Sequence, residues 1–212
     1  MTRQETLAVA LNHAVLAHGF AKSSMNTLAQ QVHISRATLY LYFKNKEAVI
    51  AAVCARHHTF LQRNQPKTLP LSAAGYLTLR LNTMLLLGAR SPVFRADLAA
   101  QYPARAAALD ADYARYTAEA VTQLQTLQQA KILAPTVHCE TLIPQDELLI
   151  TGALRQVIAA ELAVEDAVTL LRDYFESAVR GTVVDGLALP FAAVAPLTER
   201  VLAELRDTYA YR

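Results

Sequence analysis

The sequence predicts an all-α protein with a small amino-terminal three-helix domain joined to a larger helical domain. Apolar residues recur at helical spacing along nearly the whole chain, and no alternating apolar and polar run is long enough to indicate a strand. Ser, Pro and Gly stand where such helices would begin and end. The helical pattern breaks at Pro66 and Pro70, so we expect domains spanning residues 1–62 and 63–212.

The capping and breaking residues also set the expected helix bounds. A loop is expected at 133–142, between Pro135 and Pro144, and an interruption of the last helix near Pro196. The role of the carboxyl-terminal segment 185–212 stays open. The expected helices span about residues 2–18, 25–31, 36–43, 46–61, 73–89, 92–102, 104–131, 145–162, 165–184 and 191–209.

Charge is distributed unevenly along the chain. Residues 1–67 carry eight Lys and Arg against two Glu, a net charge of +6, whereas the remaining residues carry twelve against sixteen acidic residues, a net charge of −4. This split indicates a polyanionic partner for the first segment only.

The basic segment contains a predicted helix-turn-helix between residues 24 and 47. Ser24 and Ser35 can each cap a short helix, because a serine hydroxyl accepts a hydrogen bond from a free amide in the first turn. The two helices share an inward apolar side formed by Leu28, Val32, Leu39 and Phe43.

The side chains left on the outward side suit duplex DNA. Tyrosine hydroxyls suit phosphate oxygens, an arginine can bind the acceptors of guanine, and a threonine offers a hydroxyl or a methyl group to a base edge. A lysine at the start of the next helix can hold a phosphate. The candidate DNA-binding residues are Ser24, Ser35, Arg36, Ala37, Thr38, Tyr40, Tyr42 and Lys46.

This stretch resembles the amino-terminal signature of the TetR family of bacterial transcriptional regulators. The resemblance implies that the second helix enters the major groove while the first braces it across the backbone. The chain departs from the family at Val32-His33, where Ala-Gly is more usual, and at Ala37, where Gly is more usual. The resemblance covers about the first quarter of the chain and rests on Gly19-Phe20, Ser24, Leu28-Ala29, Ile34-Ser35, Thr38-Leu39-Tyr40, Tyr42-Phe43 and Lys46-Glu47.

The helix pair 145–162 and 165–184 has apolar faces wider than a solvent-exposed pair needs. In the resembled family the last two main helices form a four-helix interface with their copies in a homodimer, which suits a reader of palindromic DNA. The alternative, that both helices are core of one subunit, stays open. The expected dimer contacts are Leu154, Ile158, Leu171, Phe175 and Val179.

The resemblance also implies a pocket for a small-molecule effector in the larger domain. Between residues 71 and 131, pliable apolar side chains mix with a few hydroxyls, which favours an apolar or aromatic effector. Each of these side chains, taken alone, is more often core. The candidate pocket residues are Met84, Phe94, Tyr102, Tyr113 and Tyr116.

The composition argues against several other classes. Two cysteines and no charged, apolar leader indicate a reducing cytoplasm, and the apolar run 77–87 is too short to span a membrane. We expect no cofactor and no metal site, and the histidines are expected in solvated or helix-end positions. A helical enzyme is an alternative, but Asp110 and Asp112 point to different sides of a helix; an adaptor protein is another, but it leaves the outward tyrosines unexplained.

The expected function is therefore that of a TetR-like transcriptional regulator. The resemblance implies a repressor, since most members of the family repress transcription. It would bind palindromic operator DNA as a homodimer and be released by the effector. The operator, the effector, the regulated genes and the choice between repression and activation stay open.

Overall fold

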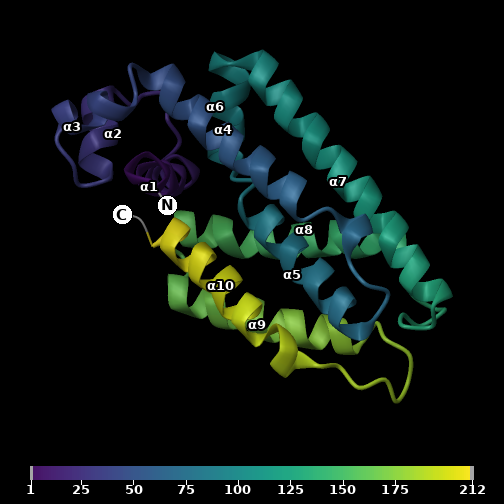
Figure 1. Ribbon diagram of the computed structural model, residues 1–212. Helices are drawn as coiled ribbons and strands as arrows, with labels where there is room; N and C mark the ends of the chain where they lie inside the picture. Colours follow the sequence, from purple (N-terminus) through teal and green to yellow (C-terminus); the bar gives the residue numbers. More distant parts are fainter. Residues whose placement is uncertain (1, 211–212) are drawn as a thin grey trace. The chain divides into compact units, whose positions relative to one another are not determined.

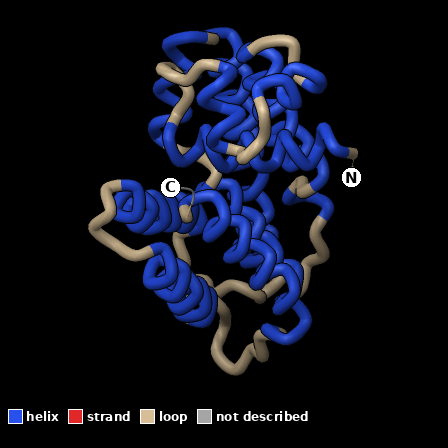
Figure 2. The backbone as a smooth tube through the Cα atoms, turned by 90° about the vertical axis from the view of Figure 1, so that its left-hand side faces the viewer, coloured by secondary structure: helices blue, strands red, loops and turns tan. Residues whose placement is uncertain are grey.

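The computed structural model describes residues 2–210, and within them the fold consists of helices and loops (Figures 1 and 2). An isolated bridge between Leu133 and Val183 is the one β-type pairing among these residues. The all-α prediction is confirmed. The helices are α1 (Arg3–His18), α2 (Met25–Gln31), α3 (Arg36–Tyr42), α4 (Lys46–Arg63), the 3₁₀ helix η1 (Pro66–Thr68), α5 (Ala73–Gly88), α6 (Pro92–Gln101), α7 (Pro103–Gln129), α8 (Cys139–Ile158), α9 (Val164–Arg180) and α10 (Phe191–Tyr209).

Hydroxyl side chains begin five of these helices, and the four serines among them were predicted as caps. Thr2 and Glu5 form a capping box at the start of α1, in which each side chain accepts a hydrogen bond from the other residue's backbone amide. The serines before α2, α3, α5 and α6 each accept a hydrogen bond from the amide three residues ahead: Ser24, Ser35, Ser72 and Ser91.

Two prolines lie inside helices, where the sequence predicted a loop or a break. α8 begins at Cys139 and contains Pro144, so the expected loop at 133–142 is wrong over its last residues. α10 runs without interruption through Pro196. Each proline lies in the second turn, so its missing amide frees a single carbonyl, on an exposed residue of the first turn where water can bind it.

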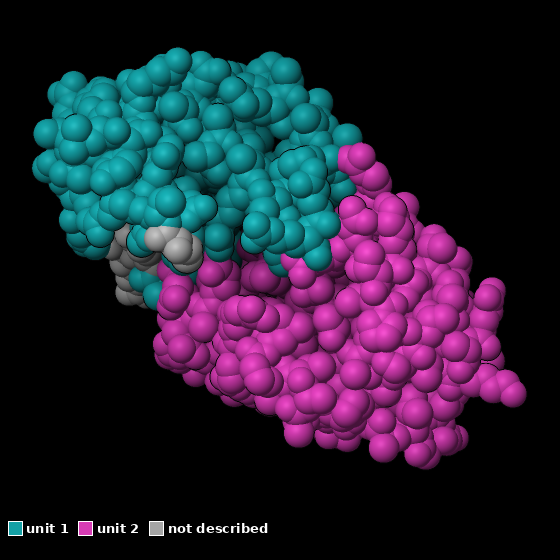
Figure 3. Space-filling model, viewed as in Figure 1, with its two compact units in different colours: residues 1–63, 90–113, 208–212 teal, residues 64–89, 114–207 magenta. Residues whose placement is uncertain are grey.

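The chain divides into two compact units (Figure 3). We call residues 1–63, 90–113 and 208–212 the head unit, and residues 64–89 and 114–207 the body unit. The long helix α7 contributes to both, as residues up to Tyr113 belong to the head unit. The expected division into domains of residues 1–62 and 63–212 stays a prediction.

In the head unit α1 packs against α2, α4 and α6, and α2 packs against α3. The Phe20 ring joins the end of α1 to α6, since its centroid lies 5.8 Å from that of Phe94 and 6.0 Å from that of Tyr102. At the other end of α1, the Gln4 side chain donates to the Tyr42 carbonyl at the end of α3, at 3.4 Å.

In the body unit α5 packs against both α8 and α9, which also pack against each other. The carboxyl-terminal segment 185–212, whose role the sequence left open, contains α10. The apolar side of this helix is buried at Val194, Val201, Leu202 and Leu205. A side-chain carbon at Gly88 would lie 2.1 Å from a methyl group of Leu205, so glycine lets α10 approach α5. The carboxyl-terminal helix is therefore part of the body unit's own core.

Candidate nucleic-acid interface

The turn between α2 and α3 is a Schellman motif. The Ile34 amide donates to the Ala29 carbonyl and the His33 amide donates to the Gln30 carbonyl, both at 3.0 Å. His33 has a φ of 55°, in the left-handed region where this motif usually places glycine. The departure seen in the sequence is therefore accommodated by a histidine in the left-handed region, and both hydrogen bonds of the motif are made.

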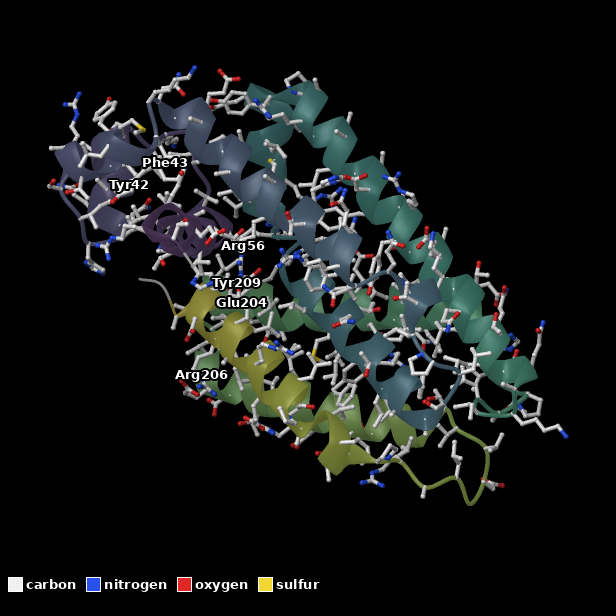
Figure 4. All side chains as sticks on the ribbon, in the orientation of Figure 1. Tyr42, Phe43, Arg56, Glu204, Arg206 and Tyr209 are labelled. Carbon is white, nitrogen blue, oxygen red and sulfur yellow. The ribbon has the colours of Figure 1, made fainter. Side chains whose placement is uncertain are left out.

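One side of the pair is buried. Leu28 and Leu39 are fully inaccessible, and Phe43 is buried beside half-buried Tyr42 at the end of α3 (Figure 4). Burial of these side chains fixes which residues of α3 remain outside.

The other side of α3 is exposed to solvent. Tyr40 exposes 43% of its surface, and Arg36 and Ala37 are also exposed. The Arg36 guanidinium carbon lies 5.3 Å from the centroid of the Tyr40 ring, a cation–π contact that holds the arginine along the outer side of the helix. The part of the predicted DNA-binding surface that carries Tyr40 is thus uncovered, whereas Tyr42 is half-buried.

Leu41 is the residue on this surface that the sequence prediction left out. It exposes 80% of its surface between the two tyrosines. A single exposed leucine is common on protein surfaces, but on a DNA-reading helix it can contact the methyl group of thymine. The only signal in the sequence was an apolar residue at a position that faces away from the core.

The hydroxyl groups of the candidate set serve the helix starts. Ser24 accepts from the Thr27 amide at 3.1 Å, and Ser35 accepts from the Thr38 amide at 3.0 Å. The Thr38 hydroxyl lies 2.8 Å from the Ser35 hydroxyl, so these two side chains form one cluster at the start of α3. Their first role is therefore to fix α3 in place.

Lys46 opens α4, as predicted, and its ammonium group is already engaged. The Nζ atom donates to the carbonyls of Phe20 and Ala21, each at 3.3 Å, and lies 5.9 Å from the Phe20 ring centroid. An ammonium group has three donors, so one is left for a phosphate oxygen. Lys46 joins α4 to the loop between α1 and α2.

That loop is also held from α6, by residues that the sequence gave no reason to select. The Asp97 carboxylate accepts hydrogen bonds from the amides of Phe20 and Ala21, and Gln101 donates to the Ala21 carbonyl at 3.0 Å. Gly19 has a φ of 71°, and a side-chain carbon there would collide with Asp97 and with Val93. α6 therefore positions the start of the helix-turn-helix.

The surface around the helix-turn-helix is basic. Lys22 and Lys44 are exposed and have no hydrogen-bond or ion-pair partner among residues 2–210. Glu47, by contrast, is paired with Arg105 at 3.2 Å, which removes one of the few acidic charges near this surface. Positive charge without local neutralisation favours binding to a polyanion.

The expected effector residues fall in both units. Phe94, Tyr102 and Tyr113 belong to the head unit, and Met84 and Tyr116 belong to the body unit. Burial raises the pKa of Tyr113 and of Tyr116 well above the usual range. The Tyr116 hydroxyl is buried with no hydrogen-bond partner at normal geometry. The nearby Thr83 side chain lowers the pKa of Tyr116, but burial raises it by more.

His57 corrects the expectation that the histidines are solvated. Its ring is buried in the head unit, where Nε2 donates to Asn12 Oδ1 at 2.9 Å and Nδ1 lies 2.5 Å from the Tyr113 hydroxyl. His13 is buried as well. The pairing of His57 ties α4 to α1 and α7 through hydrogen bonds.

The expected dimer contacts also need correction. Leu154, Leu171, Phe175 and Val179 are buried inside the subunit, and Ile158 alone of the five is exposed, at 39%. α10 covers part of α9, because the Phe175 ring packs edge-on against Phe191 and Arg172 pairs with Glu199. The large apolar residues left exposed on α8 and α9 are Leu148, Ile158 and Leu170.

Within residues 2–210 no group of His, Cys, Asp and Glu is arranged to hold a metal ion. None of the helices in this range has the length and apolar character needed to cross a membrane.

Comparisons with known proteins agree with this geometry. Residues 13–53, from the second half of α1 to the first half of α4, match the family model described as "Bacterial regulatory proteins, tetR family", which confirms the resemblance. No curated protein matches the chain in sequence.

Two solved structures are similar to this chain, and the first of them shares its fold. One, from Rhodococcus sp. and assigned to the TetR-family transcriptional regulators, is 15% identical with a TM-score of 0.53, covering 84% of this chain and 100% of that chain. Another, from Cytophaga hutchinsonii and described as a transcriptional regulator of the TetR family, is 15% identical with a TM-score of 0.47, covering 99% of this chain and 96% of that chain.

Proposed function

We propose that this chain, a transcriptional regulator of the TetR family by its amino-terminal domain, binds palindromic operator DNA as a homodimer and represses transcription until a small molecule releases it. The observation that carries the proposal is the uncovered outer side of α3, with Arg36 stacked on Tyr40 and Leu41 beside them. This function implies that the protein acts in the cytoplasm, where bacterial DNA lies.

The proposed interface residues divide into those that read bases, those that contact the sugar-phosphate backbone and those that position the helices. Arg36 and Thr38 are the proposed base readers, and Tyr40, Tyr42 and Lys46 are proposed to contact the sugar-phosphate backbone. Ser24 and Ser35 hold the helix starts and Ala37 allows close approach. Leu41 is added to this set as an apolar contact for thymine.

Dimerisation is proposed through the exposed side of α8 and α9. Leu148, Ile158 and Leu170 would meet their copies there, since a twofold axis brings identical patches together. Two heads related by this axis match the two halves of a palindrome.

The test begins with selection of bound sequences from random DNA, followed by affinity measurements over a range of salt concentrations. We expect one palindromic sequence family and a linear fall of log affinity with log salt. Arg36→Ala should relax the preference at one base, worth about 1–3 kcal/mol, without abolishing binding. Identical preferred sequences for Arg36→Ala and the parent would reject the base-reading role.

A matched pair of lysine variants tests the placement of the interface. We propose that Lys44, which is exposed beside the helix-turn-helix, also meets a phosphate, so that Lys44→Ala should reduce the salt slope by about 0.9. Lys67→Ala, which removes the same charge outside the helix-turn-helix, should leave the slope unchanged. Equal slopes for the two variants would place the DNA elsewhere.

A further inference from the structure

The outer side of α8 carries a glycine that the packing of its own subunit does not require. A side-chain carbon at Gly152 would meet no atom within 4 Å, although the residue lies inside the helix. An interior glycine destabilises a helix relative to alanine, because it loses more backbone freedom on folding. Leu148, about one turn earlier on the same side, exposes 77% of its surface. Close approach of a second helix accounts for both residues, since the side chains at a contact set the distance between packed helices.

The same side of α8 carries an unpaired positive charge. Arg155 is the one basic residue of this helix and lies less than one turn after Gly152. It is exposed, and its guanidinium has no hydrogen-bond or ion-pair partner among residues 2–210. By contrast, Arg172 on α9 is paired with Glu199. The charge of Arg155 is therefore available to a second molecule.

The outer side of α9 carries unpaired negative charge. Asp166 and Asp173 lie about two turns apart, so both face the same way, with Leu170 between them. Both carboxylates are exposed and, within the described part of the chain, neither has a hydrogen-bond or ion-pair partner. Two copies of α9 packed together along this side would bring like charges into contact. The charges therefore favour α8 as the helix that approaches its own copy.

The position of Asp173 along the helix pair determines which charge it can meet. α8 and α9 are neighbours joined by the short connection 159–163, so they run antiparallel (Figure 1). The Tyr174 hydroxyl donates to Asp146, which is held in α8 by a buried ion pair with Arg80 of α5. Asp173 therefore lies beside the amino-terminal half of α8. Asp166, near the start of α9, lies beside the carboxyl-terminal end of α8.

A twofold axis that crosses α8 at Gly152 would bring opposite charges together. The copy of α8 runs antiparallel across such an axis, so residues after Gly152 in one subunit lie beside residues before it in the other. Arg155 then lies beside the amino-terminal half of the partner's α8, at the level of Asp173 of the partner subunit. The contact occurs twice in the dimer.

We propose that α8 crosses its copy at Gly152 and that Arg155 of each subunit forms an ion pair with Asp173 of the partner subunit. The partner is a second copy of this chain, because the pairing uses one charge from each helix and leaves neither unpaired. This inference rests on the homodimer of the proposed function. It adds the helix crossing and the charge pair that distinguish a second copy from another helical surface.

Exchange of the two charges between chains tests the pairing. In a homodimer of Arg155→Glu the introduced glutamate faces Asp173 twice, and in a homodimer of Asp173→Lys the introduced lysine faces Arg155 twice. Each variant alone should dimerise about tenfold more weakly than the parent, as measured by sedimentation velocity. Mixed in equal amounts, the two chains should form a heterodimer as tight as the parent dimer, because both contacts then join opposite charges.

Two further variants separate this pairing from a general effect of charge or bulk. Asp166→Lys makes the same charge change on the same side of α9, so its mixture with Arg155→Glu should not restore dimers. Gly152→Leu adds a side chain where the subunit has space. Its helix content by circular dichroism should equal that of the parent, whereas its dimer should be about tenfold weaker, since the added side chain collides at the crossing.

Operator binding gives a second measurement, because the two halves of a palindrome need two heads. Affinity for the selected operator should fall with each charge variant and return in the mixture of Arg155→Glu and Asp173→Lys. A mixture no tighter than its components, or equal restoration by Asp166→Lys, would overturn the pairing. A parent dimer that none of these variants weakens would overturn the pairing and leave the homodimer standing. A parent chain that sediments as a monomer would overturn both.

Discussion

The carboxylate of Asp97 accepts a hydrogen bond from the backbone amide of Phe20 at 2.5 Å, and a second from the amide of Ala21 at 2.7 Å. These residues lie far apart in the sequence, on α6 and at the end of α1. Since the amides belong to the loop that leads into α2, the placement of the DNA-reading helices depends on a side chain outside the helix-turn-helix. The first prediction follows from this contact.

Asp97→Ala should lower the free energy of unfolding by about 1–3 kcal/mol, because two backbone amides lose a charged acceptor. It should also weaken DNA binding, since the loop is no longer held. Urea denaturation measures the first effect and operator titration the second. Asp110→Ala is the control: it breaks an exposed pair with Arg95 and should cost less than about 1 kcal/mol. Equal losses for the two variants would contradict the role of Asp97.

His33 supplies a test of backbone strain in the turn between α2 and α3. His33→Gly should raise the free energy of unfolding by about 0.5–1 kcal/mol, because glycine adopts a positive φ without a steric penalty. His33→Val should lower it by more than that, since a β-branched residue fits this region poorly. Thermal unfolding of both variants measures the difference, and a valine variant as stable as the glycine variant would exclude strain at this position.

Leu41→Ala should separate DNA binding from stability. The side chain is exposed, so the free energy of unfolding should change by less than about 0.5 kcal/mol, whereas affinity for the selected operator should fall. Leu71→Ala, at an exposed leucine in the body unit, serves as control and should leave affinity unchanged. An operator affinity unaffected by Leu41→Ala would remove this residue from the interface.

Introducing negative charges on the exposed side of α8 and α9 tests the proposed dimer interface. Leu148→Glu combined with Leu170→Glu should convert the dimer to monomers, because like charges would meet across the twofold axis. Sedimentation velocity measures the change, with Leu71→Glu as control. A variant that remains dimeric would move the interface away from the exposed side of α8 and α9.

The two cysteines give a prediction about reactivity. Burial raises the pKa of the Cys54 thiol and of the Cys139 thiol, so less reactive thiolate is present at neutral pH than in a free cysteine. Alkylation by iodoacetamide should therefore be slow in the native protein and fast in urea. Native labelling at the rate of a free cysteine would show that either thiol is more accessible than the structure indicates.

Features set by neighbouring residues were predictable from the sequence. The serine caps, the turn at His33 and the outward side of α3 depend on spacings of three or four residues, and each is found where expected. Leu41 was not selected, although its position on the helix is exposed.

Features that depend on distant segments were not predictable. Asp97 had no local signal of a role at Phe20, and Arg80 had none of its pairing with Asp146, since each contact joins helices far apart in the sequence. The assignment of Leu171, Phe175 and Val179 to the dimer face was wrong for a similar reason. Periodicity identifies an apolar side of α9, but it does not tell whether α10 or a second subunit will cover it.

The close approach of Leu205 to Gly88 links two positions in evolution as well as in space. When homologous sequences are aligned, those that keep the carboxyl-terminal helix should keep glycine at position 88, whereas shorter relatives are free to place alanine or a larger residue there. Along each lineage the loss of α10 should precede the loss of Gly88. A bulkier residue at position 88 would otherwise collide with Leu205 and displace α10 from α5.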